Sequence, residues 1–212
     1  MKRLRAYGWA LAFLQAAALI FAPPAWAKDK LVLAFGDSLT AGYGLKPNES
    51  FPAQLQAALI KGGIPARVHN AGVSGDTSAA GRGRLAFVLA GLKAKPDLVI
   101  LELGANDMLR GLKPDQTRAN LDAILTELGK RRIPVILAGM RASPNLGKAY
   151  QAQFDPLFAS LATRHRVRLY PFFMNGVTPN RALLIADQLH PNRRGVAIIV
   201  RGIYPLAAAG LR

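Results

Sequence analysis

Short apolar runs alternate with longer amphipathic segments about five times along the chain, and this rhythm restricts the fold more than any other feature. Leu31 to Phe35 is such an apolar run, typical of a buried strand, and strands are predicted over residues 31–35, 66–69, 97–103, 133–138 and 167–170. The intervening segments carry apolar residues at helical spacing, which predicts helices over 51–61, 77–92, 114–129, 147–164 and 191–209. Such alternation predicts an α/β fold, a three-layer α/β/α sandwich with a five-stranded parallel sheet.

Polar, glycine-rich loops follow the first three predicted strands. They cover residues 36–38, 70–75 and 104–107. In a parallel sheet the carboxyl ends of the strands share one edge, and ligand sites lie there. We therefore expect these loops to converge on one site.

Ser38 lies directly after the first predicted strand, in the sequence Gly36-Asp37-Ser38-Leu39. A serine hydroxyl becomes a nucleophile only when a base takes its proton and a third group orients that base. The sequence is not the G-x-S-x-G elbow of the α/β-hydrolases, because residue 40 is threonine. Gly36 permits a tight turn here. Taken alone, the tetrapeptide also fits an ordinary turn serine.

The chain has three histidines, and one of them lies close to an acid. His69 ends a predicted strand, and His165 lies in a basic helix end where we expect a surface residue. His190 follows Asp187 by three residues, a spacing that places both side chains on one side of a turn. One short segment then supplies both a base and its carboxylate partner.

Four motifs occur in order along the chain: Gly36 to Leu39, Gly75, Asn106, and Asp187 with His190. Together they resemble the motifs of the SGNH (GDSL) hydrolases. The resemblance extends from about Leu31 to the end of the chain. It is greatest to the periplasmic branch of bacterial arylesterases, acyl-CoA thioesterases and lysophospholipases, and it implies the flavodoxin-like SGNH hydrolase fold. Ala105 and Met108 depart from the pattern of that branch.

The resemblance implies a role for each of these residues. Ser38 attacks the acyl carbonyl, His190 accepts the serine proton, and Asp187 orients His190. The oxyanion hole consists of the backbone N–H groups of Ser38 and Gly75 and the side-chain amide of Asn106. No cofactor is expected, and the Asp, Glu and His residues are too scattered to predict a metal site.

Four further residues are candidates for binding the substrate: Met108, Met140, Phe173 and Met174. They lie on or near the loops after the third, fourth and fifth predicted strands. Methionine and aromatic side chains suit an adaptable apolar groove, and ordinary core packing is an equal alternative. We expect residues 141–150 to form a mobile loop over the site.

Asp37, Asp76 and Asp107 each adjoin a motif residue. Asp side chains readily hydrogen-bond nearby backbone groups. We expect these three to brace their loops rather than to take part in catalysis.

The first 27 residues have the layout of a secretory signal peptide. A basic start (Lys2, Arg3, Arg5) precedes the apolar residues 9–22, and Ala25-Trp26-Ala27 forms an A-x-A cleavage site. The apolar run is shorter than the roughly 20 residues that a membrane span needs. We expect residues 1–27 to be removed and residues 28–212 to form a single SGNH hydrolase domain. It would be periplasmic or secreted and have no transmembrane helix.

The chain is strongly basic and contains no cysteine, which excludes a thiol nucleophile. Its formal net charge of +16 falls to +13 once the three cations of the signal peptide are removed. The basic residues are dispersed rather than interleaved with aromatic residues, so no nucleic-acid partner is expected. Attraction to anionic envelope surfaces is the favoured interpretation of the charge.

The sequence thus predicts an exported serine esterase that forms an acyl-enzyme on Ser38. The expected substrates are small-molecule or lipid acyl esters, including aryl and alkyl esters and lysophospholipids, with acyl thioesters as a further class. One alternative is an esterase that removes O-acetyl groups from polysaccharides. The alternative from another class is a non-catalytic module that binds envelope glycan or lipid.

Overall fold

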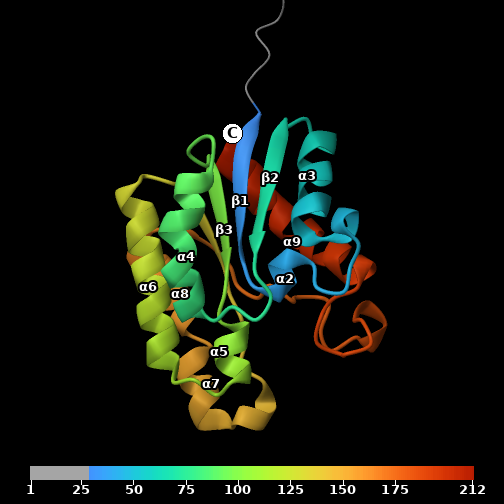
Figure 1. Cartoon of the computed structure of the whole chain (residues 1–212). Helices are drawn as coiled ribbons and strands as arrows, with labels where there is room; N and C mark the ends of the chain where they lie inside the picture. The colour runs from blue at the N-terminus through green and yellow to red at the C-terminus, as the bar shows by residue number, and fades with distance from the viewer. Residues whose placement is uncertain (1–28) are drawn as a thin grey trace, which may run out of the picture.

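The computed structural model describes residues 29–212 (Figure 1). The predicted signal peptide, residues 1–27, lies outside the described residues. The described part contains one parallel sheet with the strand order β2-β1-β3-β4-β5. This confirms the predicted five-stranded α/β architecture. The strands are β1 (Lys30–Gly36), β2 (Ala66–Gly72), β3 (Leu98–Glu102), β4 (Val135–Ala138) and β5 (Arg168–Tyr170).

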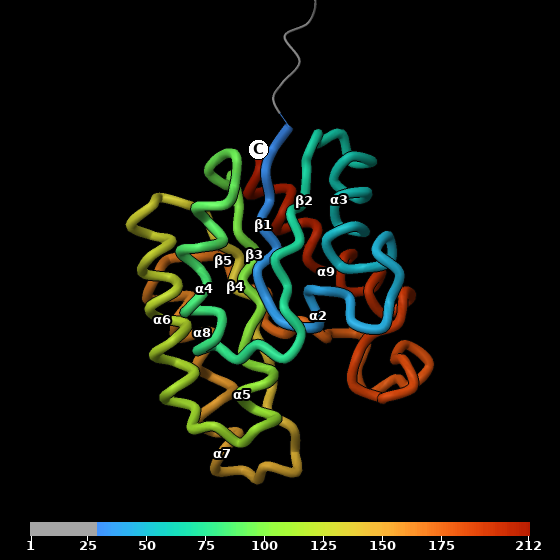
Figure 2. The backbone as a smooth tube through the Cα atoms, viewed as in Figure 1, coloured from blue at the N-terminus to red at the C-terminus, as the bar shows by residue number. Residues whose placement is uncertain are grey.

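Helices cover both faces of the sheet (Figures 1 and 2). Helices α3 (Phe51–Lys61) and α9 (Arg193–Leu211) pack together on one face. On the other face α6 (Pro114–Lys130) packs between α4 (Ser78–Gly91) and α8 (Leu157–His165). The central strands β1 and β3 are buried almost throughout, because each has neighbours on both sides and helices on both faces.

Short helices occupy several of the connections. Two of them follow β1 and β3 directly, where the sequence predicts only loops. They are too short to show a helical period. The short helices are α2 (Ser38–Ala41), α5 (Ala105–Leu109) and α7 (Lys148–Phe154), with 3₁₀ turns at Pro47–Glu49, Pro144–Leu146 and Arg181–Leu183.

Two predicted helical segments differ in detail from the observed helices. The helix predicted over 147–164 is divided into α7 and α8, with Pro156 at the N-cap of α8. Proline has no N–H to continue the hydrogen-bond ladder of a preceding helix. The last helix begins at Arg193 rather than at Pro191, because the side chain of Asn192 accepts hydrogen bonds from the backbone N–H groups of Arg194 and Gly195.

Helix α9 is long and apolar enough, by length and composition, to cross a membrane. Within residues 29–212 it is the one helix with this property. Its residues Val196, Ile199 and Ile203 are almost fully buried and belong to the hydrophobic core beside the sheet. Core packing therefore accounts for the apolar face of α9.

The order of the strands creates a topological switch point between β1 and β3. From β1 the chain moves outward to β2, and it then returns to β3 on the opposite side of β1. Ligands of such sheets bind beyond the carboxyl ends of the strands where the order reverses. The loops that follow β1 and β3 carry Ser38 and Asn106.

Candidate active site

The turn after β1 presents Ser38 at the start of α2. Asp37 caps this helix, and its Oδ1 accepts a hydrogen bond from the backbone N–H of Leu39 at 2.9 Å. Gly36 does not have a positive φ angle. A Cβ atom at this position would collide with Thr40 and lie only 2.6 Å from Glu102 Oε2. Glycine is therefore required for close packing against β3, and not for the tight turn that the sequence suggested.

Ser38, His190 and Asp187 form a continuous chain of polar contacts. Ser38 Oγ lies 2.8 Å from His190 Nε2, and His190 Nδ1 lies 2.6 Å from Asp187 Oδ2. Asp187 Oδ1 also accepts hydrogen bonds from the backbone N–H groups of Leu189 and His190, at 2.9 Å and 3.0 Å. The short segment after residue 186 thus holds the imidazole in line with the serine. The structure brings together the three residues that the sequence singled out.

The hydrogen bonds to Asp187 keep its carboxylate ionised. Burial acts to raise the pKa of Asp187, but hydrogen bonds from the backbone N–H groups of His190 and Leu189 and from the His190 ring lower it below its usual value. An ionised carboxylate stabilises the imidazolium that forms when His190 takes a proton. The Tyr43 ring packs against the ring of this histidine, with ring centroids 4.7 Å apart.

The predicted oxyanion-hole residues face the same cavity as Ser38. Gly75 has φ +86°, a backbone conformation that favours glycine. Asn106 lies in the first turn of α5 and donates from Nδ2 to Asp37 Oδ2 (3.1 Å) and to the carbonyl oxygen of Asp76 (3.0 Å). An amide group has two hydrogens. An oxyanion bound here would therefore share an Asn106 amide hydrogen with one of these acceptors, or would take the place of that acceptor.

A cavity of about 660 Å³ opens beside Ser38 and is lined mainly by apolar side chains. Three of the four predicted substrate-binding residues line it: Met108, Met140 and Met174. Other lining residues could not be recognised from the sequence, because they lie in loops or in a helix too short to show a periodic pattern. Those residues include Tyr43, Leu109, Phe172, Pro179 and Leu189.

Phe173 does not line this cavity. Its side chain is fully buried and packs edge-on against Phe51, with ring centroids 5.1 Å apart. Its neighbour Phe172 faces the cavity instead. Phe173 is therefore a core residue, and the prediction that it binds substrate is wrong.

The segment predicted as a loop over the site borders the cavity through residues 141–144. It is tied down at two points. The backbone N–H of Ala142 donates to Asp155 Oδ1 at 2.8 Å, and that of Ser143 lies 3.4 Å from Met108 Sδ. Arg141 is exposed, and its guanidinium lies over the Phe172 ring at 5.2 Å from the centroid.

The acids beside the motif residues hold the loops around the site, as expected. Asp107 is almost fully buried and accepts hydrogen bonds from the backbone N–H and hydroxyl of Ser78 and from the hydroxyl of Thr117. Asp76 forms an ion pair with Arg84 at 2.6 Å. These contacts join the loops after β2 and β3 to helices α4 and α6.

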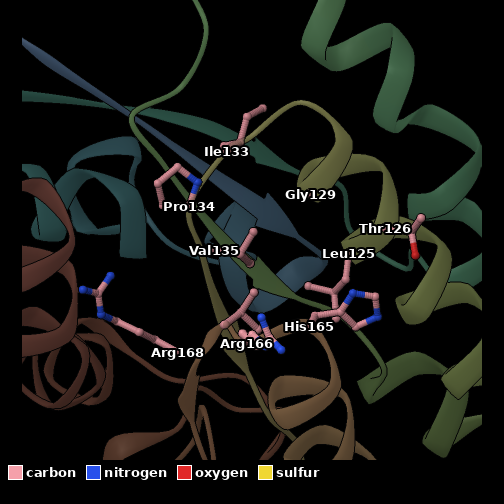
Figure 3. Close-up of a pocket in the computed structure, with 10 residues that line it drawn as sticks. Leu125, Thr126, Gly129, Ile133, Pro134, Val135, His165, Arg166 and Arg168 are labelled. Atoms are coloured by element: carbon pink, nitrogen blue, oxygen red, sulfur yellow. The ribbon is translucent and has the colours of Figure 1, made fainter.

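A second cavity, of about 760 Å³, lies at the amino ends of β4 and β5 (Figure 3). No serine, aspartate or glutamate is among its lining residues. His165 lines it and, contrary to the expected surface position, is partly buried and lies 2.7 Å from Asp122. Within residues 29–212, no cluster of three or more His, Asp or Glu residues could hold a metal ion. Of these two cavities, the first is the one lined by both a serine and a histidine.

Comparison with known proteins agrees with this geometry. Residues 34–198 match the GDSL-like Lipase/Acylhydrolase family. The chain is 36% identical to Esterase TesA of Pseudomonas aeruginosa, over 84% of this chain and 88% of that protein. It is 37% identical to Thioesterase 1/protease 1/lysophospholipase L1 of Escherichia coli K12, over 88% of this chain and 86% of that protein.

Solved structures show the same similarity. AlinE4, described as an SGNH-hydrolase family esterase, is 50% identical with a TM-score of 0.75, over 87% of this chain and 98% of that one. The crystal structure of TesA is 35% identical with a TM-score of 0.81, over 86% of this chain and 100% of that one. Sequence and fold therefore agree on one group of relatives.

Proposed function

The chain belongs to the GDSL-like lipase/acylhydrolase family and is a hydrolase of ester bonds; from this premise we propose that it is an exported serine esterase that forms an acyl-enzyme on Ser38. The observation that carries the proposal is the chain of contacts from Ser38 Oγ through His190 to Asp187, which opens on an apolar cavity. A nucleophile, a base and an orienting carboxylate in this order are the parts that acyl transfer requires.

The reaction follows from the positions of these groups. His190 Nε2 takes the Ser38 proton as Oγ attacks the acyl carbonyl, and it then returns that proton to the departing alcohol or thiol. A water molecule activated by the same imidazole next attacks the acyl-enzyme. This step releases the carboxylic acid and regenerates Ser38.

The negative charge that develops on the carbonyl oxygen is stabilised by the backbone N–H groups of Ser38 and Gly75 and by the Asn106 amide. Such donors are neutral and already oriented, so they stabilise the transition state without a titration step. The loss of one of them typically costs about 2.7–4 kcal/mol of activation free energy.

The form of the cavity supports acyl esters as the substrate class, including lysophospholipids, aryl and alkyl esters and acyl thioesters. Flexible methionine side chains can adjust to acyl chains of different length. Three exposed apolar residues, Tyr43, Leu109 and Leu189, each more than half exposed, surround the mouth of the cavity. The names of the relatives, which include an arylesterase of Vibrio mimicus, agree with this range.

Export is supported by the layout of residues 1–27, and we place the mature domain, residues 28–212, in the periplasm or outside the cell. The strong positive charge of that domain favours peripheral attraction to anionic surfaces of the envelope.

The direct test is hydrolysis of p-nitrophenyl esters by the mature protein and its Ser38→Ala variant. We expect the variant to fold normally and to lose activity by about 10⁴-fold or more, since triad residues act as a unit. Ser160→Ala, which changes an exposed serine on α8, is the matched control and should retain full activity. Unchanged turnover by the Ser38→Ala protein would refute the proposal.

Labelling with a fluorophosphonate probe separates the enzyme from a non-catalytic binding module. The proposal requires that the probe modify Ser38 in the wild-type protein and leave the Ser38→Ala variant unlabelled. An unmodified Ser38 in the folded wild-type protein would favour the binding module.

The second candidate activity, removal of acetyl groups from polysaccharides, is separated by the acyl group that is preferred. The apolar cavity of about 660 Å³ is larger than an acetyl group requires. We therefore expect an eight-carbon acyl ester to be hydrolysed faster than acetylated xylan. The reverse order would favour the polysaccharide esterase.

A further inference from the structure

Directly behind the nucleophile turn lies a buried acid that the mechanism above does not use. Glu102 is the last residue of β3 and stands in register with Gly36 at the end of β1. Its side chain is fully buried, and its Oε2 accepts a hydrogen bond from Thr40 Oγ1 (2.8 Å) and one from the backbone N–H of Asp37 (3.3 Å). The other oxygen, Oε1, is buried and has no hydrogen-bond partner among the described residues.

In the described part of the chain, no cation forms an ion pair that would compensate for this burial. Among residues 29–212 Glu102 takes part in no ion pair. Arg84 donates to the carbonyl oxygen of Gly36, but its charge is paired with Asp76. An isolated ionised carboxylate is very costly to bury, and such a group keeps its proton instead.

The carboxylate next to Glu102 also favours the protonated form of its side chain. Its pKa is raised well above the usual value by burial and by the neighbouring charge of Asp37. Burial also raises the pKa of Asp37 to about 6, although hydrogen bonds from Leu39 and Asn106 and the nearby His190 oppose the rise. Burial, the lack of an ion pair and the neighbouring carboxylate thus all favour the protonated form of Glu102.

Asp37 connects this acid to the oxyanion hole. One carboxylate oxygen of Asp37 caps the helix that begins with Ser38, and the other accepts from Asn106 Nδ2. Thr40, the other partner of Glu102, lies in the same short helix as Ser38. Glu102 thus touches both supports of the nucleophile turn but lines no part of the cavity itself.

We propose that Glu102 is a positioning residue that acts as a neutral carboxylic acid, holding Asp37 and the α2 turn so that Asn106 and Ser38 keep the geometry the oxyanion requires. An ionised Glu102 would repel the Asp37 carboxylate and displace the acceptor that orients Asn106. This inference rests on the proposed function.

The kinetic test compares Glu102→Gln with Glu102→Met in the mature protein. Glutamine keeps an acceptor for Thr40 and Asp37 and carries no charge, so kcat should fall by no more than about threefold. Methionine has a similar volume but lacks the oxygens, and kcat should fall by about 10-fold or more with KM changed by less than about twofold. A loss in kcat alone is typical of interactions made only in the transition state.

The protonation state is tested by thermal unfolding of wild type and Glu102→Gln from pH 4 to pH 8. In the unfolded wild type Glu102 has its ordinary pKa of 4.5, while in the folded protein its side chain stays neutral to a higher pH. The unfolded state then binds fewer protons than the folded state, so wild-type stability falls as pH rises above that value. The Tm of Glu102→Gln relative to wild type should therefore increase with pH.

Each outcome decides the matter. Equal losses in kcat for Glu102→Gln and Glu102→Met would show that a charged carboxylate is required, and full activity of Glu102→Met would show that Glu102 positions nothing. A Tm difference that shrinks with rising pH would overturn the neutral acid, even if Glu102→Met fails to fold. If wild type hydrolyses esters and Ser38→Ala does not, these failures would leave the proposed function intact.

Discussion

Phe172 and Phe173 are adjacent in sequence, but they lie in different environments. Phe173 fills the core beside Phe51, whereas Phe172 faces the cavity beneath Arg141. A strand or helix has a period from which the inward side chain can be inferred. The segment after β5 is irregular, so the sequence could not show which phenylalanine faces the substrate.

The two positions should respond differently to truncation. Phe173→Ala should lower the free energy of unfolding by about 3–5 kcal/mol, because it leaves a cavity in the core. Phe172→Ala should cost less than about 1.5 kcal/mol and raise KM for long-chain esters, since it removes apolar surface from the cavity wall. Urea denaturation and a chain-length series of p-nitrophenyl esters measure both effects. Equal destabilisation by the two variants would contradict this assignment.

The site residues themselves were predictable because their chemistry is distinctive. A serine after a strand, an asparagine after another and an Asp-x-x-His segment stand out in the sequence. Glu102 was missed because it was counted within an apolar strand. Its signal was available: a single acid at the end of the run from Leu98 must be buried together with its neighbours.

At the scale of elements, one side chain joins the last helix to the segment that carries the base. Asn192 Oδ1 caps α9, while its Nδ2 donates to the carbonyl oxygens of Ala182 (2.9 Å) and Leu184 (3.2 Å). His190 lies two residues before this cap. The position of the imidazole therefore depends on the docking of α9 as well as on the Asp187 turn.

Two substitutions of Asn192 separate its role as the cap of α9 from its role as a tether, the pair of hydrogen bonds that it donates to Ala182 and Leu184. Asn192→Ala loses both and should destabilise the protein by about 1–2 kcal/mol, with a reduced kcat. Asn192→Asp keeps an oxygen for the cap but loses the two donated hydrogen bonds. It should retain most of the stability of the cap and share the loss in kcat. Circular dichroism melts and ester kinetics measure the two effects, and wild-type kcat in both variants would exclude a role for the tether.

The five strands and their order of appearance were predictable, because strand-like segments alternate with helical ones and the inner strands β1, β3 and β4 are mainly apolar. The short helices α2 and α5 were not, because four or five residues cannot show a helical period. Their existence depends on tertiary contacts. Asp37 caps α2, and buried Asp107 links α5 to Ser78 and Thr117.

At the scale of the whole molecule, positive charge and the apolar rim of the cavity favour the same kind of surface. The chain carries 28 Lys and Arg residues against 12 Asp and Glu residues. Tyr43, Leu109 and Leu189 expose apolar surface around the cavity mouth, and Arg141 lies at its edge. Anionic lipid offers both negative charge and acyl chains.

We therefore expect the mature protein to bind vesicles that contain phosphatidylglycerol in low salt. Binding should weaken strongly by about 0.5 M NaCl, because salt screens charges on an exposed surface. Co-sedimentation measures the bound fraction, and vesicles of phosphatidylcholine alone are the control. Equal binding to both vesicle types would show that the net charge does not direct the protein to membranes.

The wide separation of the site residues in the sequence has a consequence for when the protein can become active. The nucleophile lies near the start of the described chain, and its partner Nε2 belongs to a residue 152 positions later. A polypeptide in which α9 has not yet docked contains Ser38 but lacks the His190 imidazole beside it. We therefore expect the chain to gain hydrolase activity only once folding has brought Ser38 and His190 together.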